Sequence, residues 1–189
     1  NIIGTFNLLE ILKDKNIKHF LMASTSSVYG GNKNLPFDEL QKTDNQISFY
    51  AATKKTNEIM THYYSHMYNL PVTMFRFFTV YGPWGRPDMA LFKFTKNIIE
   101  NKAIDIFNFG KMTRDFTYID DLVEAVSLLI SQPPKMNSDT QKNTDSISIV
   151  APWRIVNIGN NNPVELLDYI LAIENELGIK AKKNMLPMQ

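Results

Sequence analysis

The chain has 189 residues, of which 44% are apolar and 21% charged, and this composition is typical of a folded globular protein and excludes a disordered or collagen-like chain. The 20 Lys and Arg residues nearly balance the 19 Asp and Glu residues, so we expect neither nucleic acid nor a membrane surface as a partner. The chain has no cysteine and only 3 histidines, which excludes disulfide bonds and thiolate ligands, and we expect no metal site.

Apolar residues in the first half of the chain predict two helices, each followed by a short strand. They recur at helical spacing over residues 6–15, and the apolar run at 17–24 is typical of a strand that ends in small hydroxyl residues. Turn-forming and polar residues predict a long surface loop at 29–46. Ser48 is placed to cap a helix that ends just before the next expected strand, at 72–78.

The second half of the chain repeats this alternation. The expected elements are helices at 90–101, 120–131 and 163–178, strands at 104–107 and 154–158, and a polar, mobile loop at 133–146. Strands that alternate with helices are the signature of an α/β protein with a parallel sheet.

Tyr50 and Lys54 lie four residues apart on one face of an expected helix, so both side chains can reach the same small molecule. A free tyrosine has a pKa of about 10, and a nearby ammonium group favours its phenolate form. With a short hydroxyl such as Thr25, the pair suits hydride transfer at a secondary alcohol. The spacing alone also fits an aromatic side chain packed under a solvated lysine, and Tyr29 and Lys33 match it on a glycine turn.

Four longer segments occur together, at Ala23–Gly30, Tyr50–Lys55, Arg76–Asp88 and Thr113–Asp121. With them the chain resembles the extended short-chain dehydrogenase/reductases of the NAD-dependent epimerase/dehydratase family, and within it the 4-epimerases that act on UDP-glucuronate. The resemblance implies an α/β fold: the second half of a Rossmann-like, doubly wound parallel sheet plus a small α/β part that binds a nucleotide sugar. Residues 1–80 would belong to the Rossmann domain and 81–189 mainly to the substrate-binding region, with 120–158 partly returning to the sheet.

The resemblance also implies roles for single residues. Tyr50 matches the residue that removes and returns a proton, Lys54 the lysine that also binds the nicotinamide ribose, and Thr25 the hydroxyl partner at C4 of the sugar. The positions that match the NAD site are Asn1, Ala23, Ser24, Tyr50, Lys54, Phe77 and Val80. Those that match the nucleotide-sugar site are Thr25, Ser26, Ser27, Thr79, Arg86, Met89, Ala90, Asn108 and Arg114, with the arginines near the diphosphate. Without the resemblance, Arg86 and Arg114 equally fit surface ion pairs.

The implied reaction is the conversion of UDP-glucuronate to UDP-galacturonate through a 4-keto intermediate, as in polysaccharide biosynthesis. Related dehydratases and decarboxylases carry carboxyl groups where this chain has Ser26 and Ser27, so elimination lacks its acid, and we expect both serines to receive the substrate carboxylate. A 4-epimerase of UDP-glucose or UDP-N-acetylglucosamine is the alternative of the same class. An inactive, truncated domain without cofactor binding is the alternative of another class.

The sequence departs from the family's pattern at its start. It contains neither the Gly-rich turn that binds the cofactor pyrophosphate nor the acidic residue for the adenosine ribose. We therefore expect an N-terminally truncated fragment with poor NAD affinity and little turnover on its own. A homodimer through the helix that contains Tyr50 and the neighbouring helix, and a cytoplasmic location, are the further expectations from the family.

Overall fold

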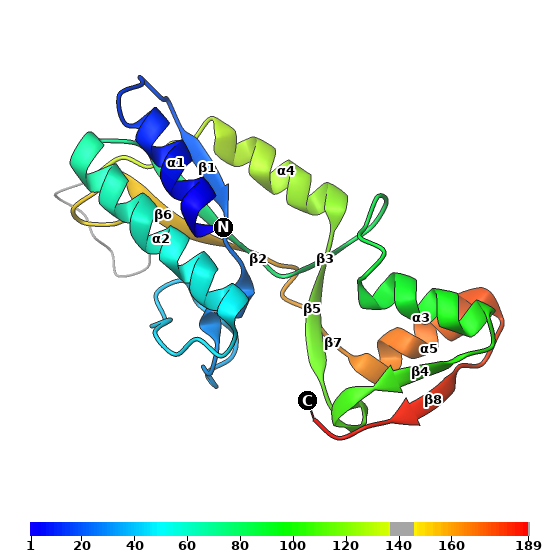
Figure 1. The fold of residues 1–189 in the computed structure, drawn as a ribbon. Coiled ribbons are helices and arrows are strands. Elements are labelled where there is room, and N and C mark those ends of the chain that lie inside the picture. Colours follow the sequence, from blue (N-terminus) through cyan, green and yellow to red (C-terminus); the bar gives the residue numbers. More distant parts are fainter. Residues whose placement is uncertain (137–145, 189) are drawn as a thin grey trace. The chain divides into compact units, whose positions relative to one another are not determined.

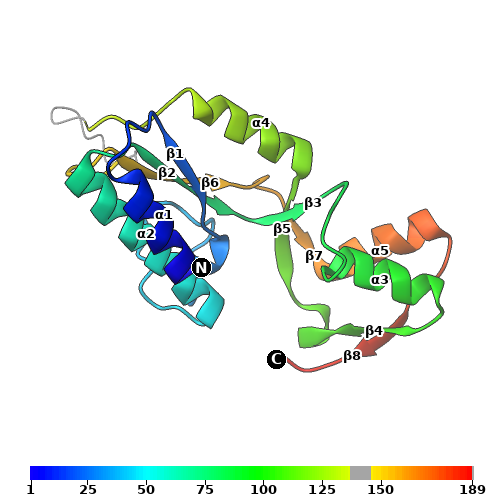
Figure 2. The same ribbon diagram turned by 45° about the horizontal axis from the view of Figure 1, so that its top comes forward.

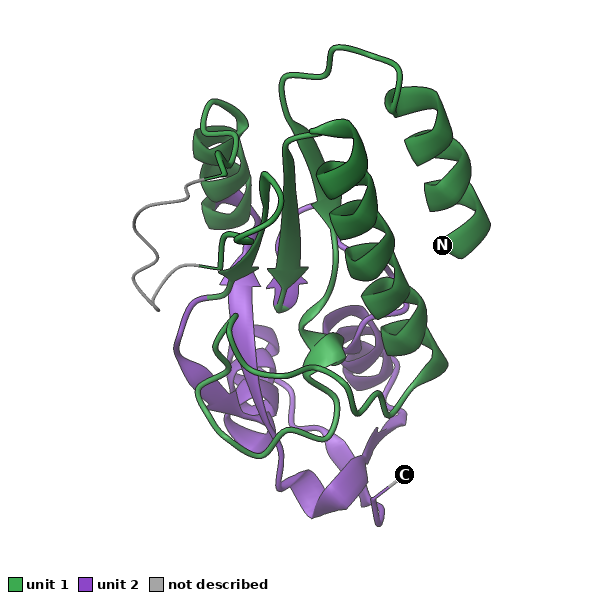
Figure 3. Ribbon diagram, turned by 90° about the vertical axis from the view of Figure 1, so that its left-hand side faces the viewer, with its two compact units in different colours: residues 1–78, 121–159 green, residues 79–120, 160–189 purple. Residues whose placement is uncertain are grey.

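The computed structural model describes residues 1–136 and 146–188, so most of the polar segment that we expected to be mobile lies outside the described residues. The chain forms two compact units, which are described here one at a time (Figure 3). Unit 1 consists of Asn1–Phe78 and Asp121–Gly159, and unit 2 of Thr79–Asp120 and Asn160–Gln189. The assignment of a cofactor-binding and a substrate-binding part to the chain stays a prediction.

Unit 1 is built on a three-stranded parallel sheet. The strands are β1 (Phe20–Ala23), β2 (Val72–Phe77) and β6 (Trp153–Ile158), in the order β1-β2-β6. Because all three run in the same direction, their carboxyl ends lie at the same edge of the sheet. The expected α/β class with a parallel sheet is confirmed.

Two helices cover this sheet and supply its core. The helices α1 (Ile2–Leu12) and α2 (Phe49–Tyr68) lie side by side (Figure 1), and Leu9, Tyr64 and Met74 are among the buried residues between them and the strands. As predicted, the Ser48 hydroxyl caps α2 and accepts a hydrogen bond from the backbone N–H of Ala51 at 3.1 Å. By contrast, none of the residues of α4 (Ile119–Ile130) is buried.

The segment between β1 and α2 contains the short 3-10 helix η1 (Ser26–Tyr29) and then the predicted long loop. The loop is anchored at several points: the amide of Gln46 donates to the Val28 carbonyl at 2.9 Å, and the amide of Asn157 in β6 donates to the Phe37 carbonyl at 3.1 Å. These bonds hold the loop against the rest of unit 1.

Unit 2 contains two small sheets. In the first, β3 (Thr79–Tyr81) runs parallel to β5 (Thr113–Tyr118), and β7 (Pro163–Glu165) runs antiparallel to β5. In the second, β4 (Ala103–Ile106) pairs in parallel with β8 (Lys182–Met185), beside α3 (Ala90–Ile99) and α5 (Leu166–Leu177) (Figure 2). The apolar core of this second group consists of Ile98, Ile104, Ile106, Ile170 and Ile173.

The structure corrects the start of the last predicted helix. We expected a helix over 163–178, but residues Pro163–Glu165 pair with β5 and the helix begins at Leu166. Its predicted end is right, because Gly178 has a positive φ of 65° and stops the helix. Among the described residues, no helix is both long enough and apolar enough to cross a membrane.

Candidate functional site

The hydroxyl residues that follow β1 form a compact turn. Thr25 is extended, with φ −160°, and is the N-cap of the 3-10 helix η1. Its hydroxyl accepts a hydrogen bond from the backbone N–H of Ser27 at 3.2 Å and donates to the Ser27 hydroxyl at 3.2 Å. Thr25 is buried, Ser26 is half-buried and Ser27 is exposed. The turn therefore places three successive hydroxyl residues, whose exposure increases along the chain, at the carboxyl edge of the sheet. Parallel α/β sheets bind ligands at this edge.

Lys54 reaches this edge from the first turns of α2. Its ammonium group donates to the carbonyl oxygen of Ala23, the last residue of β1, at 3.0 Å. Burial lowers the pKa of Lys54 below its ordinary value. Tyr50 lies one helical turn earlier, with half of its surface exposed, and its hydroxyl makes no hydrogen bond within residues 1–136 and 146–188. The structure thus brings Lys54 and the strand end together and leaves the Tyr50 hydroxyl available.

The second Tyr-x-x-x-Lys match behaves differently. Tyr29 is 1% exposed, and its hydroxyl donates to the side-chain oxygen of Asn157 at 2.7 Å. Its ring stacks on Phe37, with centroids 4.4 Å apart. This tyrosine is part of the packing between η1, β6 and the long loop.

Among the remaining predicted cofactor positions in unit 1, two side chains already make hydrogen bonds within the unit. The Asn1 amide donates to the Thr53 hydroxyl at 2.9 Å, and the Ser24 hydroxyl donates to a carboxylate oxygen of Glu58 at 2.7 Å. Phe77, the last residue of β2, is half-buried. The Ser24 hydroxyl therefore has no proton left to donate to a ligand, and its oxygen and its backbone carbonyl can serve the predicted contact only as acceptors.

Glu58 and Arg76 form a buried ion pair that the sequence did not reveal. Both side chains are 1% exposed, and Nε and Nη2 of Arg76 each donate to the Glu58 carboxylate at 3.0 Å. Burial by itself raises the pKa of Glu58, but the hydrogen bonds and charge of Arg76, with a further bond from Ser24, hold it below its ordinary value. The only available signal was the position of Glu58, four residues after Lys54, and a charged residue there equally fits a solvated helix face.

In unit 2, several predicted sugar-binding residues lie around the start of α3. Arg86 makes a two-point pair with Asp88, with distances of 3.0 Å from Nε and 2.7 Å from Nη2 to the two carboxylate oxygens, and both side chains are well exposed. Met89 is the N-cap of α3 and makes no side-chain cap, and Ala90 is its first residue. Thr79, predicted for the sugar site, and Val80, predicted for the NAD site, belong to β3, which pairs with β5.

Asn108 and Arg114 follow β4 in the sequence, whereas α3 precedes it. Asn108 has φ +51°, as does the next residue, Phe109, and such consecutive left-handed residues are costly and concentrate at functional sites. The Asn108 amide donates to the Lys111 carbonyl at 2.8 Å, which leaves its side-chain oxygen for a ligand. The Arg114 side chain is exposed on β5, and its Nη1 donates to the Thr113 carbonyl at 2.9 Å.

A model of the NAD-dependent epimerase/dehydratase family matches residues 1–144. The chain belongs to this family. It is 54% identical over 190 residues to protein CapI of Staphylococcus aureus and 51% identical over 191 residues to a probable UDP-glucuronate 4-epimerase of Rhizobium meliloti. Both matches cover 100% of this chain but only 57% and 56% of those proteins, so the chain spans little more than half the length of these relatives.

Solved structures agree with this family assignment. The UDP-glucuronic acid 4-epimerase of Bacillus cereus, solved with UDP-glucuronic acid and NAD, is 35% identical and superposes with a TM-score of 0.81. The match covers 99% of this chain and 54% of the Bacillus protein. The Rossmann-like α/β fold of this epimerase/dehydratase chain is therefore the one expected from its sequence.

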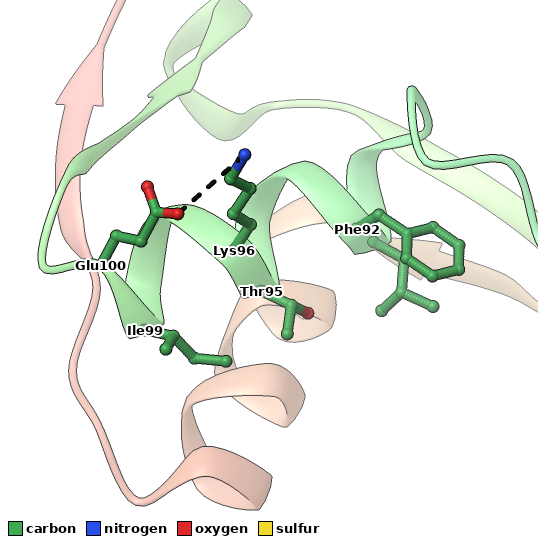
Figure 4. A pocket seen from close by; sticks show the side chains of 6 residues that line it. Phe92, Thr95, Lys96, Ile99 and Glu100 are labelled. Carbon is green, nitrogen blue, oxygen red and sulfur yellow. Dashed lines mark ion pairs between the residues drawn. The ribbon is translucent and has the colours of Figure 1, made fainter.

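An apolar hollow on α3 is lined by residues of that helix, among them Phe92, Thr95 and Ile99, and by Glu100, which follows it. Lys96 and Glu100 form an ion pair there at 4.0 Å (Figure 4). None of the residues singled out from the sequence lines this hollow. Within the described part of the chain, no three His, Asp or Glu side chains are grouped as metal ligands.

Proposed function

We propose that this chain carries the proton-transfer and sugar-contacting residues of an NAD-dependent 4-epimerase that interconverts UDP-glucuronate and UDP-galacturonate. The observation that carries the proposal is Lys54, whose ammonium group is fixed 3.0 Å from the Ala23 carbonyl at the carboxyl end of β1. Tyr50 precedes it by one turn, and the hydroxyl turn at Thr25 follows the same strand end. The names of the Rhizobium and Bacillus relatives support UDP-glucuronate as the substrate.

The groups at this strand end fit NAD. Lys54 carries three N–H donors and uses one on Ala23, which leaves two that suit the hydroxyl groups of a ribose. Phe77 and Ala23 end two neighbouring strands and offer apolar surface to a flat ring. Bound NAD+ would supply the hydride chemistry at C4 of the sugar.

Tyr50 then removes and returns the proton of the C4 hydroxyl. Its own hydroxyl has no competing partner in the described residues, and the positive charge of Lys54, one turn along the helix, stabilises the negative charge that develops on the Tyr50 oxygen. The Thr25 hydroxyl donates to Ser27 across 3.2 Å, a long bond whose proton can turn to the sugar oxygen instead. These three residues account for proton movement at the C4 oxygen.

We assign Ser26 and Ser27 to the substrate carboxylate. Both follow Thr25 directly, Ser27 is exposed, and the Ser26 hydroxyl has no hydrogen-bond partner among the described residues. Donors held on the carboxylate would discourage loss of carbon dioxide from the 4-keto sugar. Replacing both serines with alanine is expected to release UDP-pentose products, and unchanged product ratios would contradict this assignment.

In unit 2, Arg86 and Arg114 are assigned to the diphosphate, because a guanidinium fork matches phosphate oxygens. The helix α3 begins at Ala90, four residues after Arg86, and its N-cap residue Met89 makes no side-chain cap. The free backbone N–H groups of such a first turn also favour anions. Thr79 and Asn108 complete the proposed sugar contacts, and Val80 is assigned to the NAD contacts.

The proposed homodimer uses the outer face of α2. Ile59, Tyr63 and Met67 are spaced by four residues, and each is more than half exposed, so they form an apolar stripe along the helix. Such a stripe fits a partner surface better than water. The dimer and the cytoplasmic location both stay predictions.

A segment exchange tests the proposed reaction. This chain replaces the matching 191-residue segment of the Rhizobium relative, with which it is 51% identical, and products from UDP-glucuronate and UDP-N-acetylglucosamine are separated by chromatography. We expect UDP-galacturonate as the main product, and Tyr50→Phe should lower the rate about 100- to 10,000-fold. Tyr68→Phe, on the same helix, is the matched control and should retain the rate. A folded exchange protein that epimerises only UDP-N-acetylglucosamine, or neither sugar, would overturn the proposal.

A further inference from the structure

Glu58 lies inside unit 1, on the side of α2 that faces the strand ends. Its carboxylate accepts four hydrogen bonds: two from Arg76 at 3.0 Å each, one from the Ser24 hydroxyl at 2.7 Å and one from Lys55 at 3.3 Å. The side chains of Glu58 and Arg76 are 1% exposed. A buried ion pair is costly to desolvate and gives little net stability. Stability alone therefore does not explain why this pair lies at the strand ends.

The Glu58 carboxylate links α2 to the end of β1, and Lys54 makes a second hydrogen-bonded link between the same two elements. The Lys54 ammonium group donates to the carbonyl of Ala23, and the hydroxyl of Ser24, the first residue after the strand, donates to Glu58. Lys54 and Glu58 are four residues apart and so lie on the same face of the helix. The backbone N–H of Ser24 also donates to the carbonyl of Phe75 in β2 at 2.6 Å. The residue immediately before Thr25 is therefore fixed by both α2 and β2.

Arg76 braces the residues on the other side of Thr25. Its guanidinium lies 4.8 Å from the ring centroid of Tyr29, the last residue of η1, and Nη2 donates to the Thr43 hydroxyl of the long loop at 3.5 Å. The ion pair of Glu58 and Arg76 thus reaches both ends of the short segment 24–29. Thr25 is the only residue of that segment assigned above to proton transfer.

We propose that Glu58 is a positioning residue, which together with Arg76 holds Ser24 and thereby fixes the Thr25 hydroxyl and the Ala23 carbonyl relative to Lys54. The importance of these three groups rests on the function proposed above. A displacement of about 1 Å in a reacting group can cost about 100-fold in rate. Hydrogen bonds that fix the position of Ser24, next to Thr25, would therefore maintain the reaction rate. A merely structural ion pair would contribute to folding and leave the order of Thr25 and the environment of Lys54 unchanged.

The test uses the 189-residue chain without ligand and measures two NMR signals. The first is the order parameter of the Thr25 methyl group, and the second is the pH titration of the Lys54 side chain. Ser24→Ala removes the tie alone, and Glu58→Gln removes the charge while keeping the shape. Ser65→Ala is the matched control, because Ser65 is also buried and its hydroxyl has no partner among the described residues.

We expect Ser24→Ala and Glu58→Gln to lower the Thr25 order parameter. Ser24→Ala, which keeps the Glu58 charge, should also raise the pKa of Lys54, which burial lowers, toward its ordinary value. Ser65→Ala should change neither signal. If both signals are unchanged in Ser24→Ala, the proposal is wrong, even when Glu58→Gln unfolds or melts earlier. Neither NMR signal depends on a ligand. If UDP-glucuronate does not bind in a separate titration, that result counts against the proposed function but not against the positioning of Thr25 by Glu58.

Discussion

Replacing Glu58 with glutamine should destabilise the protein strongly, although the change keeps the shape of the side chain. The amide oxygen can still accept from Ser24 and from Nε of Arg76. The amide nitrogen, however, would face the donors Nη2 of Arg76 and Nζ of Lys55, now 3.0 Å and 3.3 Å from the carboxylate. Arg76, which is 1% exposed, would also be left as a buried cation without its counter-ion.

Removing one partner of a buried ion pair costs about 3–5 kcal/mol, and for a chain of this size that lowers the melting temperature by about 6–20 °C. The assay is thermal unfolding followed by circular dichroism at pH 7. Glu124→Gln is the matched control in the same unit, because Glu124 is exposed on α4, and such surface changes stay within about 0.5 kcal/mol.

The effect should also depend on pH in one direction. The folded state holds the pKa of Glu58 below the ordinary 4.5, so its contribution to stability is complete above that pH and is lost as the pH falls. The difference between the native chain and Glu58→Gln should therefore shrink as the pH falls below 4.5. A difference of less than about 1 kcal/mol at pH 7, well short of the cost of a broken buried pair, or one that is constant down to pH 3, would refute the reasoning.

Three further outcomes follow from single contacts. Asp88→Asn should raise the affinity for UDP-glucuronate a few-fold in calorimetry, because the two-point pair of Arg86 with Asp88 competes with a phosphate for the same guanidinium; a weaker affinity would contradict this. The hydrogen bond from Lys183 is the main reason why the pKa of Glu174 is lowered to about 2. A carboxyl NMR titration should therefore show a midpoint near that value, and Lys183→Met should move the midpoint toward 4.5. The stability that Glu174 contributes is complete above pH 4.5 and is lost on acidification toward pH 2. Ile59→Glu, on the exposed stripe of α2, should convert dimer to monomer in analytical ultracentrifugation, and an unchanged sedimentation coefficient would remove that stripe from the interface.

The helices of this protein could be predicted because their apolar faces are periodic and their ends carry clear signals. Ser48 caps α2 and Gly178 ends α5, and both were visible in the sequence. The strand β7 was missed because three residues that begin with a proline also fit the first turn of a helix. The strand β8 was missed because all four of its side chains are exposed, so it has no alternating apolar pattern.

The candidate site was predicted only in part. The spacing of Tyr50 and Lys54 predicts a shared helix face, but not that Lys54 reaches the Ala23 carbonyl. The pair of Glu58 and Arg76 was invisible, because charged residues at buried positions look like surface residues until the partner is known. Pairing across 18 residues depends on how α2 lies against β2, which local patterns do not encode.

The most direct measurement is a calorimetric titration of this chain with UDP-glucuronate, followed by UDP-N-acetylglucosamine and UDP alone. The Arg86→Ala and Arg114→Ala variants are titrated in parallel. We predict saturable binding that is tightest for UDP-glucuronate and weaker in both variants, because the sugar carboxylate and the diphosphate each meet assigned donors. Equal binding of all three nucleotides, or no binding of any, would contradict the proposed role of this chain as the sugar-contacting part of a UDP-glucuronate 4-epimerase.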